Sequence, residues 1–201
     1  MNYTQIAGMA TDNMNPNTSW YKNFKTAPYA TEYALNAGIM LMNLTRMREV
    51  GYHDALEPIA LKWNNLLPWF DQDVLNVYFH DHPDQFLELP CRFNYLTDHC
   101  SARKEQFCES AEKNGVAILH GSRGVFHKHT QLTFKAVYES IRDYQVTTAN
   151  THNLEKLLIS FMLKLNRIKK STSCGNVSAI FTKTLKDIVL QHNFHQLGKA
   201  R

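Results

Sequence analysis

Apolar residues follow two different patterns along this chain. Compact apolar runs at residues 35–44 and 116–119 predict buried strands, and Phe86–Leu89 predicts a short strand. Apolar positions three and four residues apart predict helices over residues 53–67 and 131–143. Strands that alternate with helices are typical of an α/β fold.

The two ends of the chain differ from this middle part. Apolar residues at helical spacing over 154–165 and 177–188, separated by Cys174-Gly175, predict a helical hairpin at the C-terminus. Residues 1–30 are polar and rich in Asn, Thr and Pro, which predicts loop. We therefore expect a loop-rich segment at 1–30, a central α/β part at 31–145 and a helical extension at 146–201.

Two short segments have the composition of helix ends. Thr45 is a suitable first cap for a short helix that Gly51 would end. Asp71 is a suitable cap for a helix that runs through Val74, Leu75 and Phe79.

Composition and charge exclude several classes of protein. With 201 residues, of which 44% are hydrophobic, the chain can form one globular domain with a real core. The net charge is +4, and the basic residues are mostly scattered, so we expect no nucleic-acid partner. No stretch approaches the roughly 18 apolar residues that span a bilayer, and the N-terminus does not resemble a signal peptide.

Four cysteines bear on the compartment. They are Cys91, Cys100, Cys108 and Cys174, and the first three lie nine and eight residues apart, which does not match the short Cys-x-x-Cys spacing of a zinc site. Disulfides are the better interpretation, and they indicate a secretory compartment. Because the chain shows no signal or anchor, we expect that the front of a longer protein is missing.

The triplet Asp71-Gln72-Asp73 has three interpretations. Its hard oxygens can hold a divalent cation, or two acids can stabilise the start of a helix. With Trp69 before it and Asn76 after it, the triplet can also bind sugar hydroxyls, which need both donors and acceptors. Gln72 supplies both. Spacing alone favours the helix-start interpretation, and the other two stay open.

Two further motifs carry candidate chemistry. His120-Gly121-Ser122-Arg123-Gly124 follows a predicted strand, where α/β proteins gather ligands. The imidazole could bind a metal and Arg123 could pair with a phosphate, or the motif is an ordinary loop. In Asn36-Ala37-Gly38 the glycine allows a ligand, or simply a neighbouring chain, to approach the backbone.

Taken together, these motifs resemble a known family. Asn36-Ala37-Gly38, Asp71-Gln72-Asp73 and Leu119-His120-Gly121 resemble, in this order, the later motifs of the family 8 retaining glycosyltransferases. Met40-Leu41-Met42-Asn43-Leu44-Thr45-Arg46-Met47-Arg48, Pro90-Cys91-Arg92-Phe93-Asn94-Tyr95 and the segment from Ile118 to His127 look like the glucoside xylosyltransferases. The resemblance covers roughly residues 15 to 185.

The resemblance implies a GT-A fold and a specific reaction. Members of this group transfer xylose from UDP-xylose, with retention (α-1,3), to glucose that is O-linked to epidermal-growth-factor-like (EGF-like) repeats of glycoproteins such as Notch. They act in the lumen of the Golgi or endoplasmic reticulum and are single-pass type II membrane proteins. Any membrane contact would therefore come through an N-terminal anchor that is absent from this chain.

The resemblance also implies roles for individual residues. Asn36 and Gly38 would line the donor sugar, next to Trp69, and Asp71 and Gln72 would face the reacting carbon. His120 would be a ligand of Mn²⁺. Gly121 and one of the cations, Arg123 or Lys128, would meet the diphosphate, because Arg123 occupies a place where many relatives have glycine. Residues 31–145 would then be the donor- and acceptor-sugar half of the catalytic domain.

One expected part is missing from the sequence. In the family the metal-binding Asp-x-Asp lies upstream, in the half that holds uridine, and we expect that this sequence begins after the point where that motif occurs. His120 alone would hold Mn²⁺ poorly, so we predict that these 201 residues have little transferase activity by themselves. Measurable turnover of UDP-xylose would contradict that prediction. The alternative is a truncated, non-catalytic product that binds a glycoprotein or a partner enzyme.

Overall fold

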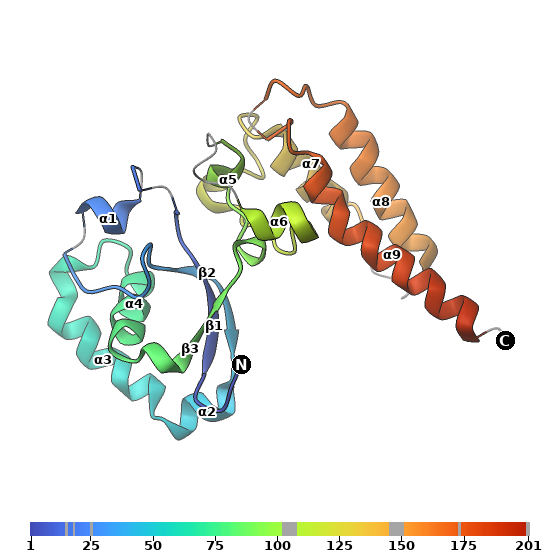
Figure 1. Cartoon of the computed structure of the whole chain (residues 1–201). Coiled ribbons are helices and arrows are strands. Elements are labelled where there is room, and N and C mark those ends of the chain that lie inside the picture. The colour runs from blue at the N-terminus through green and yellow to red at the C-terminus, as the bar shows by residue number, and fades with distance from the viewer. Residues whose placement is uncertain are drawn as a thin grey trace. The chain divides into compact units, whose positions relative to one another are not determined.

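The computed structural model describes residues 1–14, 16–17, 19–24, 26–101, 108–144, 151–172 and 174–199. The chain divides into two compact units, Met1–Asn94 and Tyr95–Arg201, and each is described here by itself (Figure 1). The boundary between the two units falls between Asn94 and Tyr95.

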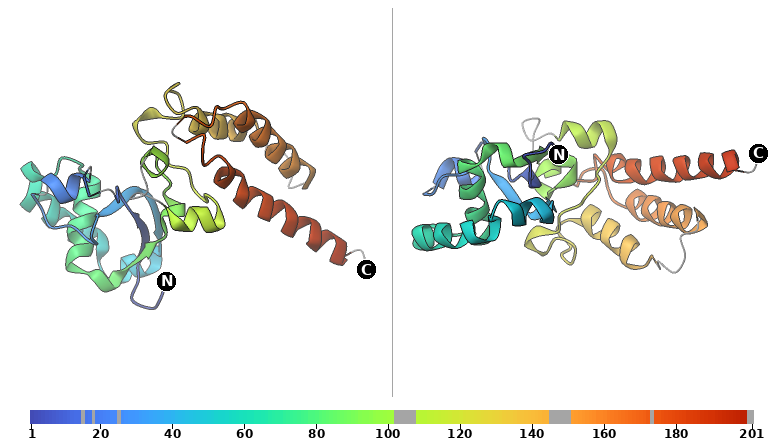
Figure 2. Two further views of the ribbon diagram at one scale, coloured as in Figure 1. Left: turned by 45° about the horizontal axis from the view of Figure 1, so that its top comes forward. Right: turned by 90° about the horizontal axis from the view of Figure 1, so that it is seen from below.

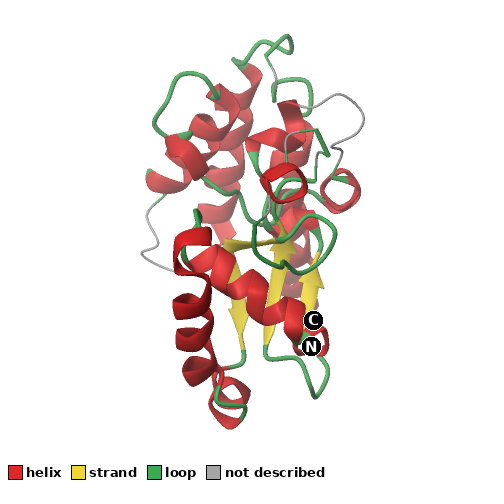
Figure 3. Ribbon diagram, turned by 90° about the vertical axis from the view of Figure 1, so that its left-hand side faces the viewer, coloured by secondary structure: helices red, strands yellow, loops and turns green. Residues whose placement is uncertain are grey.

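The first unit is built around a three-stranded sheet (Figure 3). Its central strand is β1 (Ala7–Thr11), which pairs antiparallel with β2 (Leu35–Met42) and parallel with β3 (Phe86–Leu89). The strands predicted at 35–44 and at Phe86–Leu89 are confirmed. The loop predicted for residues 1–30 is wrong, because β1 lies within it and all five of its residues are buried. Its sequence, Ala-Gly-Met-Ala-Thr, has no alternation because neither face meets water.

The position of β2 in the sheet differs from the expected buried strand. Leu35 and Asn36 are buried, whereas Leu41 and Met42 are about half exposed. In the sheet order β2-β1-β3, this strand lies at an edge among the residues that the structure describes. An edge strand has a neighbour on one side only, so an apolar run is not enough to bury it.

Helices pack on this sheet through an apolar and aromatic core. The helices of the first unit are α1 (Trp20–Phe24), α2 (Leu44–Glu49), α3 (Tyr52–Trp63) and α4 (Asp71–Asp81), with short 3₁₀ turns η1 (Asn64–Leu66), η2 (Pro83–Gln85) and η3 (Cys91–Phe93). Helix α4 packs on β2, and α3 packs on α4. Met9, Leu35 and Phe79 are fully buried where these elements meet.

The helix ends correct two predictions. Asn43, not Thr45, caps α2, since its side-chain oxygen accepts the backbone N–H of Arg46 at 3.2 Å. Gly51 follows that helix in the left-handed region (φ 65°), as predicted. Helix α4 begins at Asp71, but the capping position is Phe70, whose side chain has no hydrogen-bonding group, so Asp71 is the first helical residue rather than the cap.

The second unit is mostly helical (Figure 2). Its elements are α5 (Thr97–Ser101), α6 (Glu109–Asn114), the 3₁₀ turn η5 (Ser122–Gly124), α7 (Leu132–Arg142), α8 (Thr151–Asn166) and α9 (Ala179–Lys199). Helix α8 packs against both α7 and α9, so the predicted C-terminal helical hairpin and the helix over 131–143 are confirmed. The strand predicted at 116–119 is wrong. In the described residues this segment makes one isolated bridge, between Leu119 and Tyr95, because no further strand of the unit pairs with it.

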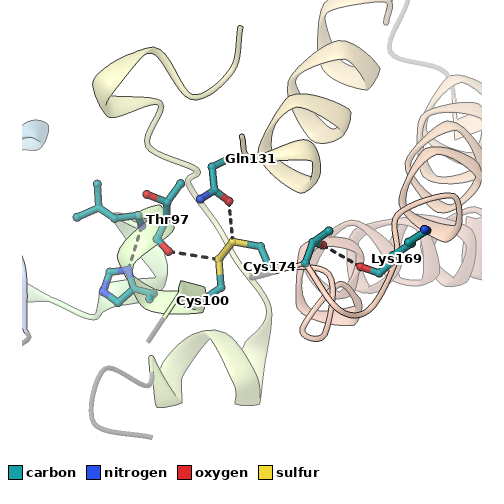
Figure 4. Close-up of a disulfide and its surroundings, with 8 residues drawn as sticks. Thr97, Cys100, Gln131, Lys169 and Cys174 are labelled. Atoms are coloured by element: carbon teal, nitrogen blue, oxygen red, sulfur yellow. Dashed lines mark hydrogen bonds between the residues drawn. A yellow bond between two sulfur atoms is a disulfide. The ribbon is translucent and has the colours of Figure 1, made fainter. Parts of the chain in front are cut away.

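An aromatic cluster and a disulfide hold the second unit together. The rings of Tyr95, Phe134 and Phe181 contact one another at centroid distances of 5.6 to 6.4 Å. The Cys100–Cys174 disulfide joins α5 to the turn between α8 and α9 (Figure 4). All four cysteines are disulfide-bonded, which confirms the prediction made from their number and spacing. Among the described residues, no helix has the length and apolar character needed to span a membrane.

Candidate functional site

The first unit brings two predicted sugar-binding motifs into contact, Asn36-Ala37-Gly38 and Asp71-Gln72-Asp73. The side-chain oxygen of Gln72, in the first turn of α4, accepts the backbone N–H of Ala37 on β2 at 3.1 Å. Asn36 and Gly38 flank that N–H on the same strand. The amide of Gln72 therefore lies against the Asn36-Ala37-Gly38 segment, although 35 residues separate the two bonded residues in sequence.

Asn36 has an acidic neighbour that sequence reasoning missed. Its side-chain Nδ2 donates to Oδ1 of Asp12 at 2.7 Å, and its Oδ1 accepts the N–H of Gly38 at 2.9 Å. Asp12 is the residue directly after the buried strand β1, which is where α/β proteins gather ligands. Recognising β1 in the sequence would have identified Asp12, but the lack of alternation in the strand concealed it.

The second acid of the Asp71-Gln72-Asp73 triplet has a structural role. Asp73 is 5% exposed, and its carboxylate accepts the hydroxyl of Tyr21 at 2.7 Å and the backbone N–H of Trp69 at 2.6 Å. It thus satisfies a backbone donor at the start of α4, which an acid in the first helical turn does well. The helix-start interpretation therefore holds for Asp73. The pKa of the Tyr21 phenol is raised, first by burial and then by this hydrogen bond to Asp73.

Asn76 fixes α4 to the edge strand. It is fully buried, its Oδ1 accepts the N–H of Leu35 at 2.7 Å, and its Nδ2 donates at 2.8 Å to the carbonyl oxygens of Leu35 and Gln72. The side chain thus takes the place of a neighbouring strand for Leu35. Both amide protons of Asn76 are already donated, so its role in this structure is to position Gln72 rather than to offer protons to a sugar.

The side chains of Asp71 and Trp69 have surroundings different from those of the Gln72 amide. Asp71 is exposed and lines a groove of about 420 Å³ between α3 and α4, together with His53, Asp54, Leu56, Glu57, Ala60, Val74 and Leu75. Successive helical positions point about 100° apart, which explains why Asp71, Gln72 and Asp73 have different surroundings. Trp69 is 50% exposed and contacts the ring of Trp20 edge-on at 5.9 Å.

The other predicted site residues lie on one loop of the second unit. His120 is partly buried, and its backbone N–H donates to the carbonyl oxygen of Tyr95 at 3.1 Å. Gly121 packs so closely on Phe126 that an added Cβ would lie 2.2 Å from the ring, so this position requires glycine. A backbone hydrogen bond at His120 and close packing at Gly121 therefore hold the start of this loop.

Two cations of this loop are exposed. Arg123 has a left-handed backbone (φ 57°), which is uncommon for a residue with a side chain, and it pairs with Asp98 at 3.3 Å. Lys128 lies on the surface. Both cations can therefore be reached by an anionic ligand.

The described residues do not supply a complete metal site. Among them, no group of three or more His, Cys, Asp or Glu side chains is arranged to hold a metal ion. Mn²⁺ prefers several hard oxygen ligands, and a single imidazole does not meet that need. The described residues therefore do not fit a manganese ion by themselves.

Comparison with known proteins identifies a family and several similar proteins. The model of glycosyl transferase family 8 matches residues 1–120. The chain is 38% identical to glucoside xylosyltransferase 1 of Danio rerio over 94% of this chain and 48% of that protein. For the human glucoside xylosyltransferase 1 the identity is 37%, over 92% of this chain and 43% of the relative. Glucoside xylosyltransferase 2 of Mus musculus is 35% identical over 92% of this chain and 43% of that protein.

These matches confirm the resemblance to glucoside xylosyltransferases, and they run over both units of the chain. The chain spans a little less than half the length of these relatives. The family match covers β1 to β3, the Gln72 contact with β2, and the segment that ends at His120. The chain belongs to glycosyl transferase family 8.

Proposed function

We propose that this chain forms the sugar-handling part of a retaining xylosyltransferase with a GT-A fold. The donor would be UDP-xylose, and the acceptor would be glucose O-linked to EGF-like repeats of glycoproteins such as Notch. The contact of Gln72 with β2 beside Asn36 carries this proposal, together with the similarity to glucoside xylosyltransferases over both units. The contact places two side-chain amides, each with donor and acceptor groups, at the end of one strand.

The chemistry of these groups suits a sugar donor. An oxocarbenium-like sugar is stabilised by nearby carbonyl or carboxylate oxygen, and Gln72 and Asp71 carry such groups at the start of α4. Asn36, held by Asp12, keeps a second amide proton that can donate to a sugar hydroxyl. We assign the donor sugar to Asn36, Gly38 and Gln72, and assign supporting roles to Asp71 and Trp69.

For the diphosphate and the metal, we propose the residues of the loop that carries His120. The exposed cations Arg123 and Lys128, with the backbone at Gly121, would neutralise the diphosphate. His120 would be one ligand of Mn²⁺, and the other ligands would be acids outside the described set. When bound, the ion would stabilise the leaving diphosphate as a Lewis acid. His120 alone would hold Mn²⁺ poorly, so we expect little turnover from these 201 residues alone.

The disulfides and the similarity to glycosyltransferases fit the lumen of the secretory pathway. We further propose a Golgi or endoplasmic reticulum location and a type II membrane anchor for the protein in which these residues act.

Donor binding can be tested separately from turnover. Saturation-transfer NMR with UDP-xylose and Mg²⁺ would report which protons of the xylose ring contact the 201-residue chain. Loss of one sugar hydrogen bond costs roughly 1 kcal/mol, so Gln72→Ala and Asn36→Ala should each weaken binding about fivefold. Gln191→Ala, at an exposed position on α9, is the matched control and should bind normally.

Two results would oppose the proposal. Absence of signal from the xylose ring would contradict the proposed donor site. Equal binding of UDP-glucose would contradict the assignment of xylose as the donor sugar. Binding of an O-glucosylated repeat without any donor binding would instead favour a non-catalytic glycoprotein-binding chain, which the incomplete metal site also allows.

A further inference from the structure

The direction of each hydrogen bond around the Gln72 amide can be assigned from chemistry alone. The backbone N–H of Ala37 can only donate, so the Gln72 atom that it contacts at 3.1 Å is the oxygen, Oε1. The other end of the amide is therefore Nε2, which lies 3.3 Å from the hydroxyl oxygen of Tyr21. Because Nε2 donates, that hydroxyl oxygen accepts.

The proton of Tyr21 is then committed to Asp73. The Tyr21 hydroxyl lies 2.7 Å from Oδ1 of Asp73, and the carboxylate can only accept. The second carboxylate oxygen accepts the backbone N–H of Trp69 at 2.6 Å. The protons thus run in one direction, from Ala37 to Gln72 Oε1 at one end and from Gln72 Nε2 through Tyr21 to Asp73 at the other.

We propose that Tyr21 is a positioning residue that fixes the orientation of the Gln72 amide, with Asp73 holding the Tyr21 proton. This inference rests on the proposed function for its bearing on the donor sugar. Tyr21 is 4% exposed, and the structure gives it no contact that would make it a catalytic residue.

A reversed amide is disfavoured at both ends. Turning Gln72 by 180° would place its NH₂ group against the N–H of Ala37, so that two donors would face each other. The same turn would place Oε1 against the hydroxyl oxygen of Tyr21, whose proton is directed at Asp73. Without Tyr21, only the Ala37 contact would orient the side chain. In the proposed site a sugar would therefore meet the Gln72 carbonyl on the β2 side and the Gln72 amide NH₂ group on the Tyr21 side.

The orientation can be observed directly by NMR. In the 201-residue chain labelled with ¹⁵N, the side-chain NH₂ resonances of Gln72 can be assigned as the pair that disappears in Gln72→Ala. We expect Tyr21→Phe to move this pair toward the positions of a solvent-exposed glutamine and to speed its exchange with solvent. The matched control is Tyr3→Phe, which removes a hydroxyl from a residue that is 85% exposed and should leave the pair unmoved.

A second variant keeps the test decisive if Tyr21→Phe does not fold. Asp73→Asn retains Tyr21 but offers a single carbonyl oxygen to two donors, the Trp69 N–H and the Tyr21 hydroxyl. The Gln72 pair should move again, because the Tyr21 proton is no longer committed. An unmoved pair in a folded sample of either variant would overturn the inference.

Adding UDP-xylose separates this inference from the proposed function. If the nucleotide sugar moves the Gln72 pair in the unsubstituted chain, and Tyr21→Phe reduces that response about tenfold, both ideas are supported. If UDP-xylose has no effect while Tyr21→Phe still moves the pair, Tyr21 orients the amide but the donor site fails. Where turnover can be measured, a positioning role predicts a loss in kcat that exceeds any change in KM.

Discussion

The two units of this protein place their candidate site residues in contrasting surroundings. In the first unit the polar side chains of Asn36, Asp73 and Asn76 are buried, and each has a hydrogen-bond partner on a segment that is distant in the sequence. In the second unit Arg123 and Lys128 are exposed on a loop, while aromatic packing and a disulfide hold the surrounding helices.

This contrast separates two ways of building a binding site. Buried polar side chains are held by hydrogen bonds to their neighbours, so the fold fixes their geometry before any ligand arrives. Exposed cations attract an anion over a distance but are not held in one orientation. Sugar recognition needs directed hydrogen bonds and diphosphate recognition needs charge, so the residues proposed for each differ in the way that this chemistry requires.

The largest expected effect concerns the covalent link of the second unit. The Cys100–Cys174 bond closes a loop with a sequence separation of 74, and loss of that constraint costs about 4 kcal/mol by loop entropy. In the double variant Cys100→Ser/Cys174→Ser, hydrogen exchange should show α8 and α9 opening far more often than β1. Ala179→Ser, at an exposed position on α9, is the control. Equal protection of both units in the cysteine variant would contradict the view that this disulfide, which joins the turn of the hairpin to α5, stabilises α8 and α9.

A smaller effect is expected from the hydrogen-bonded junction of the first unit. Asn76→Ala removes the partner of the Leu35 N–H and of the two carbonyl oxygens, all in a buried setting, which should cost about 3 kcal/mol of unfolding free energy. Denaturant unfolding measures this cost. Asn65→Ala, at an exposed position in the same unit, should stay within about 0.5 kcal/mol of the unsubstituted chain. A loss below about 1 kcal/mol in Asn76→Ala would show that packing, rather than hydrogen bonding, joins α4 to β2.

The smallest effect concerns a buried histidine in the second unit. Burial lowers the pKa of His99 to about 4, despite the opposing effect of Asp98, and its Nδ1 accepts the N–H of Leu96 at 2.9 Å. The unfolded chain, with a histidine pKa near 6.5, binds the proton first, so stability falls as pH drops from about 6.5 toward 4. Between pH 7.5 and pH 5 the loss should be about 2 kcal/mol.

The variant His99→Gln isolates this term. Its side-chain oxygen can still accept the Leu96 N–H, but it does not titrate, so the acid-sensitive part of the unfolding free energy should disappear. If the unsubstituted chain and the variant lose stability in parallel on acidification, other groups are responsible.

The sequence by itself determined the helices α2, α3, α4, α7, α8 and α9, two of the strands, the cysteine chemistry and the family. Apolar residues recur at helical spacing over 131–143 and beyond because one face of each helix is buried. This pattern is visible in the sequence itself. The family motifs are local as well, because Asn36-Ala37-Gly38 and Asp71-Gln72-Asp73 are each contiguous. These features need no knowledge of distant contacts.

Tertiary structure decided which side chain does what. Spacing did not show that β1 is the central strand, because a strand buried on both faces has no alternation. Nor did it show that Asp73 would be buried against Tyr21 while Asp71 stayed exposed, since Tyr21 lies 52 residues from Asp73 in the sequence. The roles of Asp12, Tyr21 and Asn76 arise only when the strands and α4 come together, because a hydrogen bond between distant segments leaves no local pattern in the chain.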